Sequence, residues 1–422
     1  MGLGYIGLPT AAVVARAGMR VLGVDVSAKV VETINRGEIH IEEVDLDGLV
    51  QGVVQRGLLS ASTEIAPADV FVIAVPTPFA KDGHHSPDVS YVLAAGETVA
   101  KVLKPGDLVI LESTSPVGTT ERIRDALAAA RPDLALPGLT AGTPDVAIAY
   151  CPERVLPGRI LEELTNNDRS IGGITPRCAR KALAFYKRFV RGTCVTTDAR
   201  SAEMTKLVEN AYRDVNIAFA NELSIVADSM GLDVWEVIRL ANRHPRVNIL
   251  NPGPGVGGHC IAVDPWFIVH GAREETPLIQ TARGVNDGKI RHVIARATAL
   301  AEAHPAEKIA CLGLAFKADI DDFRESPARL VAATLARKFG GRVHVVEPFA
   351  EKLPIEFTDT GATQLTLEQA LATCGVLIVL VDHGEFRRVP LGARSAKQVY
   401  DTRGIWPDQP SAPMAQELRK TG

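Results

Sequence analysis

A glycine-rich loop at the start of the chain sets the strongest limit on its fold. Gly2, Gly4 and Gly7 fit the pattern G-x-G-x-x-G, and residues 8–18 have the periodicity of a helix. In a dinucleotide-binding loop the first glycine makes a tight turn, the second lets the backbone approach a pyrophosphate, and the third lets helix and strand pack closely. Asp25 ends the next apolar segment, 18 residues after Gly7, where a carboxylate accepts hydrogen bonds from a ribose and repels a 2′-phosphate. The pattern therefore predicts a Rossmann-type fold that binds NAD rather than NADP.

The strand that this motif normally follows is missing, because only Met1 precedes Gly2. In a Rossmann sheet that strand lies in the middle, so its neighbours would lose ladder partners and expose apolar faces. Such a loss costs many kcal/mol against a typical total stability of about 5 to 15 kcal/mol. We therefore expect an N-terminal sheet without its first strand, and our hypothesis is that this sequence starts inside a longer natural chain. Intact mass of the protein from its native source tests this, since a stable, NAD-active species beginning at Met1 would refute it.

Apolar runs that alternate with helical segments define the rest of the fold. A short apolar run bounded by turn residues is typical of a strand in a buried parallel sheet. Such runs occupy residues 21–26, 69–78, 107–116, 146–158, 308–317, 341–348 and 375–383. From about residue 198 a long stretch without proline has helical periodicity instead. The sequence therefore predicts an α/β protein in which two Rossmann-like parallel-sheet domains are joined by a central long-helix region, with domains at 1–197, 198–304 and 305–422.

Composition limits the partners of the chain. Its 422 residues carry a formal net charge of −4 and are 46% hydrophobic, which is typical of a globular protein and gives no electrostatic footprint for nucleic acid or an anionic membrane. We expect neither a signal peptide nor a run near the roughly 18 apolar residues of a membrane span. The six cysteines lie far apart without a C-x-x-C pair, which predicts reduced thiols in the cytoplasm and neither a disulfide framework nor a metal site.

A cysteine stands at the end of a loop rich in glycine and proline. Residues 252–258 are mostly glycine and proline, so this segment is a loop whose backbone passes close to something. Cys260 follows, with His259 and Asp264 beside it. Taken alone, such a cysteine is either an inert buried hydrophobe or a reactive thiolate. A peptidase with His259 as base is disfavoured, because side chains adjacent in sequence usually point apart and a peptidase has no use for an NAD fold.

The long helix carries a polar stripe. Lys206, Asn210 and Arg213 stand at positions i, i+4 and i+7, so they share one face of a helix that is otherwise partly apolar. The stripe is either a solvated surface or, near a thiol, a set of partners for an oxyanion or a carbonyl.

Motifs along nearly the whole chain resemble the UDP-glucose/GDP-mannose dehydrogenase family. They are "GLGYIGLPTA", "AVPTP", "ESTSPVGT", "YCPERVLPG", "EMTKLVENAYRDVNIAFANEL", "GPGVGGHCIAVDP" and "LAFKADIDDFRESPA", in this order. The chain is most similar to members that act on UDP-N-acetyl-D-mannosamine. The resemblance implies a four-electron oxidation of a sugar C6 alcohol to a carboxylate with two NAD, through a cysteine thiohemiacetal and thioester, for cell-surface polysaccharide precursors. It also implies a homodimer formed through the central helices.

The resemblance also implies roles for particular residues. The catalytic residues would be Cys260 as nucleophile, Lys206 and Asn210 at the developing alkoxide, Asp264 orienting water or Lys206, and Glu153 as a base for thioester hydrolysis. The NAD site would comprise Gly2, Gly4, Tyr5, Ile6, Gly7, Asp25, Thr77, Thr114 and Arg324. The UDP-sugar would meet Arg154, Val155, Lys206, Asn210, Arg213, His244, Arg246, Gly257, Phe316, Lys317 and Arg403. In the family the position of Arg403 can be Lys, and His244 with Arg246 could reach a site in the partner chain.

Several alternatives stay open from the sequence. Taken by itself, Glu153 is predicted to be an exposed carboxylate in a loop. The substrate could be another nucleotide sugar, such as UDP-N-acetylglucosamine or UDP-glucose, because no sequence rule separates an axial from an equatorial acetamido group. A two-electron hydroxyacid dehydrogenase with a helical lysine, and a sugar-nucleotide binder without catalysis, are the remaining classes. The yield of NADH per sugar separates all three.

Overall fold

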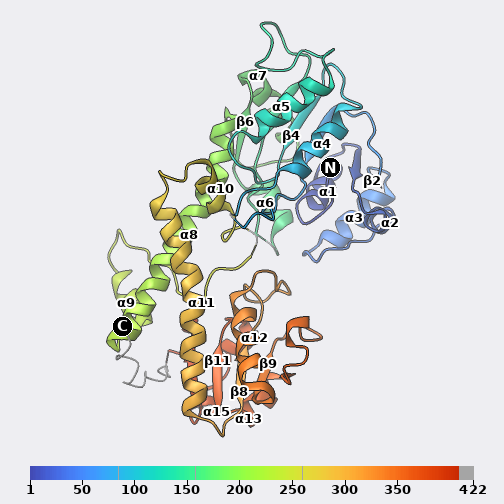
Figure 1. The fold of residues 1–422 in the computed structure, drawn as a ribbon. Coiled ribbons are helices and arrows are strands. Elements are labelled where there is room, and N and C mark those ends of the chain that lie inside the picture. Colours follow the sequence, from blue (N-terminus) through green and yellow to red (C-terminus); the bar gives the residue numbers. More distant parts are fainter. Residues whose placement is uncertain (84, 157, 259, 408–422) are drawn as a thin grey trace. The chain divides into compact units, whose positions relative to one another are not determined.

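The structure is a computed structural model that describes residues 1–83, 85–156, 158–258 and 260–407 (Figure 1). The chain divides into two compact units. The first comprises residues 1–209 and 266–273, and the second comprises residues 210–265 and the chain from 274 onward. Each unit is described on its own. Among the described residues, none of the helices has the length and apolar composition that a membrane crossing requires.

The first unit is an α/β fold built on two sheets. A five-stranded sheet has the order β3-β4-β5-β6-β7, and β1 pairs with β2 in a separate parallel ribbon. Four of these strands lie within apolar runs that were predicted as strands: β1 (Val21–Val24), β3 (Val70–Ile73), β4 (Leu108–Leu111) and β5 (Ala147–Tyr150). The other strands are β2 (Leu59–Ser62), β6 (Arg169–Gly173) and β7 (Cys194–Asp198). The helices are α1 (Gly7–Arg16), α2 (Ala28–Asn35), α3 (Leu46–Gln55), α4 (Ser90–Ala100), α5 (Thr119–Ala130), α6 (Ile160–Asn166) and α7 (Pro176–Tyr186).

The first two residues lie between the two sheets of this unit. The Met1 amine donates to the carbonyl of Val72, and the Met1 carbonyl accepts from the amide of Ala74, each at 2.9 Å. The amide of Gly2 donates to the carbonyl of Val24 at 2.8 Å. Met1 and Gly2 thus supply backbone partners to both β3 and β1, at the place where the sequence predicts a missing strand.

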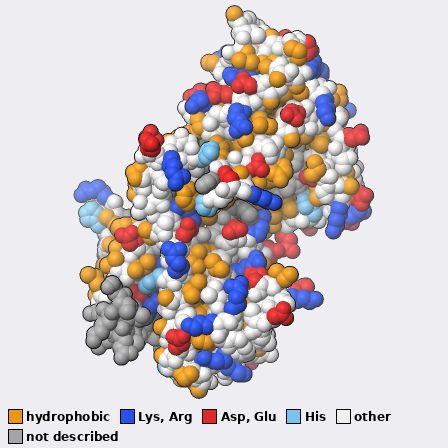
Figure 2. Space-filling view, in the orientation of Figure 1, with side chains coloured by type: hydrophobic (Ala, Val, Ile, Leu, Met, Phe, Trp, Pro, Cys, Tyr) orange, Lys and Arg blue, Asp and Glu red, His pale blue; other side chains and the backbone are white. Residues whose placement is uncertain are grey.

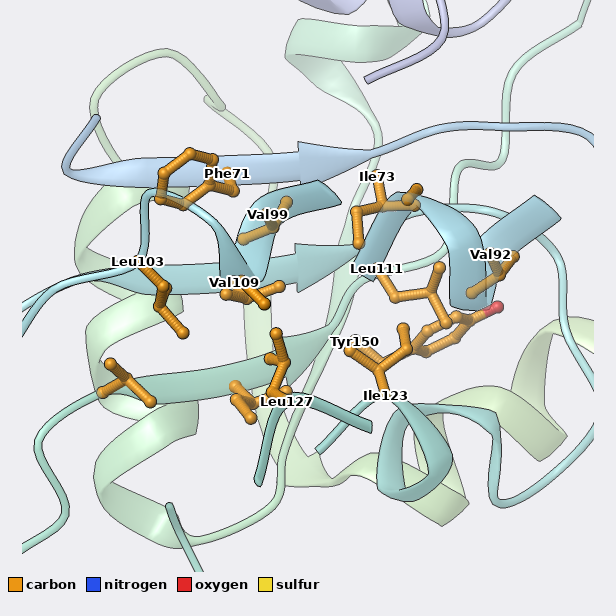
Figure 3. Close-up of a cluster of buried hydrophobic side chains, with 14 of the residues drawn as sticks. Phe71, Ile73, Val92, Val99, Leu103, Val109, Leu111, Ile123, Leu127 and Tyr150 are labelled. Carbon is orange, nitrogen blue, oxygen red and sulfur yellow. The ribbon is translucent and has the colours of Figure 1, made fainter. Parts of the chain in front are cut away.

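A buried apolar cluster fills the space between the five-stranded sheet and two helices (Figure 3). Side chains of β3, β4 and β5 point into it because alternate residues of a strand face the same side of a sheet. The helices α4 and α5 cover that face with branched side chains. The cluster includes Phe71, Ile73, Val92, Val99, Val109, Leu111, Ile123, Leu127 and Tyr150. It fixes the strands whose carboxyl ends carry the loops of the candidate site.

Among the described residues, two long helices and two short ones follow the first sheet. They are α8 (Ala199–Met230), α9 (Val234–Ala241), α10 (Asp264–Gly271) and α11 (Pro277–Ala303). The helices α8 and α11 run in the same direction and are joined by buried hydrogen bonds, such as that from Asn221 to Asn286 at 2.8 Å. The polar residues buried on α11, among them Asn286 and Lys289, interrupt its apolar stripe, which is why the sequence alone did not delimit this helix.

The second unit ends in a five-stranded parallel sheet of order β10-β9-β8-β11-β12. Its strands are β8 (Ile309–Leu312), β9 (Val343–Val346), β10 (Thr363–Gln364), β11 (Val376–Val379) and β12 (Gln398–Asp401). Its helices are α12 (Pro327–Phe339), η1 (Gly340–Arg342), η2 (Ile355–Phe357), α13 (Leu367–Thr373), α14 (Gly384–Arg387) and α15 (Leu391–Arg394). The chain reverses its direction of winding between β8 and β11, and open α/β sheets bind ligands outside the carboxyl ends of the strands at such a point.

The predicted fold class is confirmed as an α/β chain with Rossmann-like parallel sheets. The strand β6, which the sequence did not single out, pairs antiparallel with β5, and the other strand pairs of this five-stranded sheet are parallel. The glycines at the end of β6 allow close packing against its other neighbours: a Cβ at Gly172 would lie 2.5 Å from the carbonyl oxygen of Asp198 in β7, and one at Gly173 would lie 2.3 Å from the amide of Ala179 in α7. The domain boundaries at 197/198 and 304/305 stay a prediction.

Candidate active site

Packing within the protein requires a glycine at two positions of the fingerprint, and the third position has room for a side chain. Gly2 has a φ of +80°, and a Cβ there would lie 2.8 Å from the carbonyl oxygen of Ala74. A Cβ at Gly7 would lie 1.8 Å from the carbonyl oxygen of Gly2. At Gly4, which is exposed, a Cβ would meet nothing within 4 Å. Internal packing therefore explains Gly2 and Gly7, whereas Gly4 leaves open space beside the start of α1, as close approach of a pyrophosphate requires.

Asp25 lies directly after β1, where the fingerprint places the ribose-binding carboxylate. One carboxylate oxygen accepts from the amide of Leu3 at 2.9 Å, and the other accepts from the amide of Ser27 at 2.9 Å. Each oxygen has two lone pairs, so both retain acceptor capacity for ribose hydroxyls. Tyr5 and Ile6 are half-buried in the turn before α1. These residues fit an NAD molecule bound across the loop.

Two predicted cofactor residues meet at the carboxyl edge of the first sheet. Thr77 follows β3 and Thr114 follows the adjacent strand β4, and the Thr77 hydroxyl donates to the carbonyl of Thr114 at 2.6 Å. The third, Arg324, lies in the second unit, where its guanidinium pairs with Asp322 at 2.5 Å. The structure therefore brings Thr77 and Thr114 together, and the assignment of Arg324 to the cofactor stays a prediction.

Glu153 is a buried, paired carboxylate and not an exposed loop residue. Its side chain is 7% exposed. One oxygen pairs with the buried Arg169 at 3.0 Å, and the other accepts from the amide of Arg154 at 2.7 Å. The Arg154 guanidinium in turn pairs with Glu209 at 2.6 Å, and Val155, which follows it, is half-buried. Two hydrogen bonds thus fix the orientation of the Glu153 carboxylate.

Charged residues that the sequence did not single out lie beside Glu153. Arg169 follows a loop and opens β6, and its charge gave no signal that it would be 3% exposed. Arg169 also lies over the ring of Tyr186, whose hydroxyl donates to Glu112 at 2.7 Å. Complete burial raises the pKa of Glu112 to about 7, even though the Arg169 charge opposes the rise. An acidic residue at the end of the apolar strand β4 was the available signal for a buried titratable group.

The helix α8 presents Lys206 one turn after a buried glutamate. Lys206 is half-buried. Glu203 is fully buried and accepts from the amide of Gly118 at 2.6 Å and from the amide and hydroxyl of Thr120 at 2.7 and 2.6 Å. Burial raises the pKa of Glu203, although these hydrogen bonds oppose the rise. Glu203 therefore ties the start of α5 to α8, a role that the sequence analysis did not predict.

In the second unit, the amide of Asn210 donates to the Asp264 carboxylate at 2.5 Å. Both side chains are buried. Asp264 is the first residue of α10, and its backbone amide donates to the carbonyl of Cys260 at 2.8 Å. The structure thus brings together three of the predicted catalytic residues. His259, considered as a peptidase base, lies outside the described residues.

Cys260 differs from the other cysteines in its exposure. It is exposed, Cys194 is half-buried, and the remaining four are buried. Burial raises the pKa of Cys151 and of Cys311 to about 12, so those two thiols are inert at neutral pH. The exposed position satisfies the first requirement for a nucleophile that must meet a substrate.

The glycine and proline loop passes close to the edge of the C-terminal sheet. A Cβ at Gly257 would lie 2.6 Å from the carbonyl oxygen of Glu325, and one at Gly258 would lie 3.0 Å from the ring of Phe316. At Gly253 a Cβ would lie 2.5 Å from a guanidinium nitrogen of Arg403. The prediction of a close approach is therefore confirmed, and the close neighbours are protein groups.

Three predicted substrate residues follow strands of the C-terminal sheet, two of them after β8 at the switch point and one after the edge strand β12. Phe316 and Lys317 follow β8 and are half-buried, and Arg403 follows β12 and pairs with Asp382 at 2.8 Å. Asp382 itself follows β11. Three other predicted substrate residues are exposed side chains of the second unit, on α8 and in the segment after α9: Arg213, His244 and Arg246. Their assignment to substrate binding stays a prediction.

On the face that Figure 2 shows, acidic and basic side chains are interspersed among the described residues. Among those residues, no group of three or more His, Cys, Asp and Glu side chains is arranged to hold a metal ion.

In comparisons with known proteins, the chain matches three family models, one after another along the sequence. The NAD-binding domain of the UDP-glucose/GDP-mannose dehydrogenase family matches residues 1–190, its central domain matches 200–288, and its UDP-binding domain matches 310–408. An NDP-N-acetyl-D-galactosaminuronic acid dehydrogenase of Ralstonia nicotianae is 55% identical over 406 residues, which are 96% of this chain and 95% of the relative. A UDP-N-acetyl-D-mannosamine dehydrogenase of Salmonella typhi is 54% identical over 414 residues, 96% of this chain and 98% of the relative.

A solved structure is similar over the whole chain. It is that of a UDP-D-ManNAc dehydrogenase from Pyrococcus horikoshii, with a TM-score of 0.84 at 36% identity, covering 98% of this chain and 96% of that one.

Proposed function

Since the chain belongs to the UDP-glucose/GDP-mannose dehydrogenase family, we propose that it oxidises UDP-N-acetyl-D-mannosamine at C6 to UDP-N-acetyl-D-mannosaminuronate. It is an NAD-dependent nucleotide-sugar dehydrogenase, and the proposal adds the sugar, the thiol chemistry and the use of two NAD per sugar. The observation that carries it is the exposed Cys260, set at the end of the glycine loop with its carbonyl bound by the amide of Asp264.

The residues proposed to hold NAD are the fingerprint glycines, Tyr5, Ile6, Asp25, Thr77, Thr114 and Arg324. The bound nicotinamide ring would accept one hydride from C6 in each oxidation. The chain's part is to present the open backbone at Gly4 to the pyrophosphate and the Asp25 carboxylate to the ribose.

In the proposed mechanism the Cys260 thiolate adds to the C6 aldehyde made in the first oxidation. The adduct is a thiohemiacetal, whose C6 can give up a second hydride to become a thioester. Lys206 would stabilise the developing alkoxide and move its proton, and Asn210 would donate a hydrogen bond to the same oxygen. The hydrogen bond from Asn210 to Asp264 at 2.5 Å supports this arrangement, because it fixes the Asn210 amide before substrate binds.

Water must then cleave the thioester to release the acid. Glu153 is the proposed base, and Asp264 would orient the water or Lys206. A base acts efficiently only when it is held in one orientation within reach of the proton. The pairing of Glu153 with Arg169 and with the amide of Arg154 supports the assignment, because it holds the carboxylate at both oxygens.

The UDP moiety is proposed to bind at the switch point of the C-terminal sheet. Phe316, Lys317 and Arg403 would contact it there, with Gly257 in the loop above. Arg154, Val155, Lys206, Asn210, Arg213, His244 and Arg246 complete the proposed set of substrate residues.

We also propose a cytoplasmic homodimer formed through the central helices. Large apolar side chains lie exposed on the described helices α8 and α9 and in the segment that joins them: Tyr212, Phe219, Met230, Leu232 and Leu240 are each more than half exposed. Exposed apolar side chains gathered on helices are typical of a subunit interface. Analytical ultracentrifugation tests the dimer, and a monomer at micromolar concentration would contradict it. The proposed product would supply cell-surface polysaccharide.

A second candidate substrate is favoured by one comparison. The Ralstonia relative, at 55% identity, is named for an N-acetyl-D-galactosaminuronic acid. Side-by-side assays with UDP-N-acetyl-D-mannosamine, UDP-N-acetyl-D-galactosamine and UDP-N-acetyl-D-glucosamine decide between them. We expect the highest kcat/KM with the mannosamine, and equal or better turnover of either other sugar would overturn the assignment.

A further inference from the structure

A buried row of amide side chains connects α8 and α11 to the loop that carries Cys260. The carbonyl oxygen of Asn221 accepts from the backbone amide of Gly253 at 2.9 Å. The amide nitrogen of Asn221 donates to Asn286 at 2.8 Å, and the amide nitrogen of Asn286 donates to Asp214 at 2.8 Å. Arg283 pairs with the same oxygen of Asp214 at 2.7 Å. Asn221, Asn286 and Asp214 are all fully buried, so each hydrogen bond in the row is shielded from water.

The row fixes which atom of Asn221 faces the loop. An asparagine can present either its oxygen or its amide nitrogen to a neighbour, and only the oxygen accepts a backbone N–H. Asp214 can only accept, so Asn286 turns its nitrogen toward Asp214 and its oxygen toward Asn221. Asn221 must then turn its nitrogen toward Asn286 and its oxygen toward Gly253. The acidic end of the row thus determines the orientation of every amide in it.

The loop from Gly253 to Asp264 is held at both ends by one helix. Asn221 holds Gly253, and Asn210 holds Asp264 at 2.5 Å. Asn210 and Asn221 are eleven residues apart on α8, which is three turns and about 17 Å at 1.5 Å per residue. They therefore lie on the same face of the helix, with Cys260 between the two attachment points along the chain.

The backbone of the loop start cannot compensate for a lost attachment. Gly253 lies against a guanidinium nitrogen of Arg403, so a shift of the loop start would also disturb a residue proposed to bind UDP. Without the Asn221 oxygen, the buried amide of Gly253 would lack its acceptor, which is unfavourable for a buried group and favours an opened loop.

We propose that Asn221, oriented by Asn286 and Asp214, is a positioning residue that fixes the loop bearing Cys260. It does not touch the reacting atoms. This inference rests on the proposed function for its effect on turnover, but its effect on the loop is independent of any substrate.

The test compares Asn221→Ala with Ser224→Ala. Ser224 lies one turn further along α8, donates to the backbone carbonyl of Asn221 at 2.6 Å and accepts from Lys289 of α11 at 2.6 Å, so S224A removes a partly buried hydrogen bond between the same two helices and leaves the Asn221 side chain in place. That bond does not involve the loop. A third variant, Asn221→Ser, places a hydroxyl where the side-chain amide carbon stands, one bond short of both Gly253 and Asn286, and it guards against misfolding of N221A because it keeps a polar group in the buried row.

Two readouts are expected to separate the variants. Hydrogen exchange of the peptide containing Gly253, followed by mass spectrometry, should be at least about tenfold faster in N221A and N221S than in S224A. The kcat for NADH formation should fall about tenfold or more in N221A and N221S, with a much smaller change in KM, because displacing a reacting group by about 1 Å can cost about 10²-fold. S224A should lower the melting temperature without either change.

The outcomes distinguish the two proposals. Exchange and kcat in N221A and N221S that match S224A would overturn the positioning role. Faster loop exchange in N221A and N221S, with a wild-type protein that forms no NADH from any UDP-hexosamine, would support the attachment of the loop and refute the proposed function.

Discussion

Gly4 and Gly7 offer a matched pair of substitutions that separates cofactor binding from folding. A methyl group at Gly7 would lie 1.8 Å from the carbonyl oxygen of Gly2, whereas one at Gly4 would meet nothing within 4 Å. An ordinary contact starts near 3.4 Å, so Gly7→Ala requires a backbone shift of more than an ångström in a buried turn. Gly4→Ala requires no shift in the protein and affects only what approaches the loop from outside.

The expected magnitudes follow from these contacts. Overpacking of this severity costs about 3 kcal/mol, which lowers the melting temperature by about 6–12 °C in a unit of about 200 residues. Gly4→Ala should change it by no more than about 2 °C, because it touches no protein atom. Its NAD dissociation constant should rise at least about tenfold, equivalent to about 1.4 kcal/mol.

Differential scanning fluorimetry without NAD, together with titration calorimetry of NAD into each variant, measures both effects. Wild-type NAD affinity in G4A would refute the argument that the open space at Gly4 serves the cofactor. A melting temperature in G4A as low as that in G7A would refute the packing argument as well.

Three further predictions concern buried carboxylates. Glu153→Gln should retain a burst of NADH but lower steady-state turnover by about 10²-fold, because only thioester hydrolysis needs the base; rapid mixing with substrate checks it, and the absence of a burst would contradict it. Burial raises the pKa of Glu112 from 4.5 to about 7, so the folded chain retains a proton there that the unfolded chain releases, and stability should fall by about 3 kcal/mol as pH rises through that window. Glu112→Gln should flatten this part of a plot of melting temperature against pH, and an unchanged slope would show that another group is responsible. Glu203→Ala leaves three donors from Gly118 and Thr120 without their acceptor and should lower the melting temperature by about 6–12 °C, which calorimetry would contradict by finding wild-type stability.

The apolar strands were predictable from the sequence because burial on both faces leaves a continuous apolar run. The strands β4 and β5 and the three central strands of the C-terminal sheet, β8, β9 and β11, illustrate this, since all of their residues are buried. The edge strand β7, with the sequence CVTTD, is mostly half-buried or exposed. It therefore lacks the apolar run that marks a buried strand, and its neighbour β6 ends in two glycines whose packing only the structure reveals.

The candidate site was predicted best where the spacing of residues in a motif implies the local backbone geometry. The glycine spacing implied the turn, and Asp25 implied the carboxylate beside it. Residues that act through others gave no such signal. Asn221 and Asp214 look like ordinary polar residues of a surface helix, and only the partner helix α11 shows that they are buried. Arg169 was missed for the same reason, because its partner Glu153 comes from a different segment.

The yield of NADH per UDP-sugar tests the central claim most directly. With limiting UDP-N-acetyl-D-mannosamine and excess NAD, the wild-type protein should form two NADH per sugar and release the uronate. Cys260→Ala should form one NADH and stop at the aldehyde, because no thiol is present to form the adduct that gives up the second hydride. A yield of two NADH from C260A, or of one from the wild type, would contradict the proposed thiol mechanism.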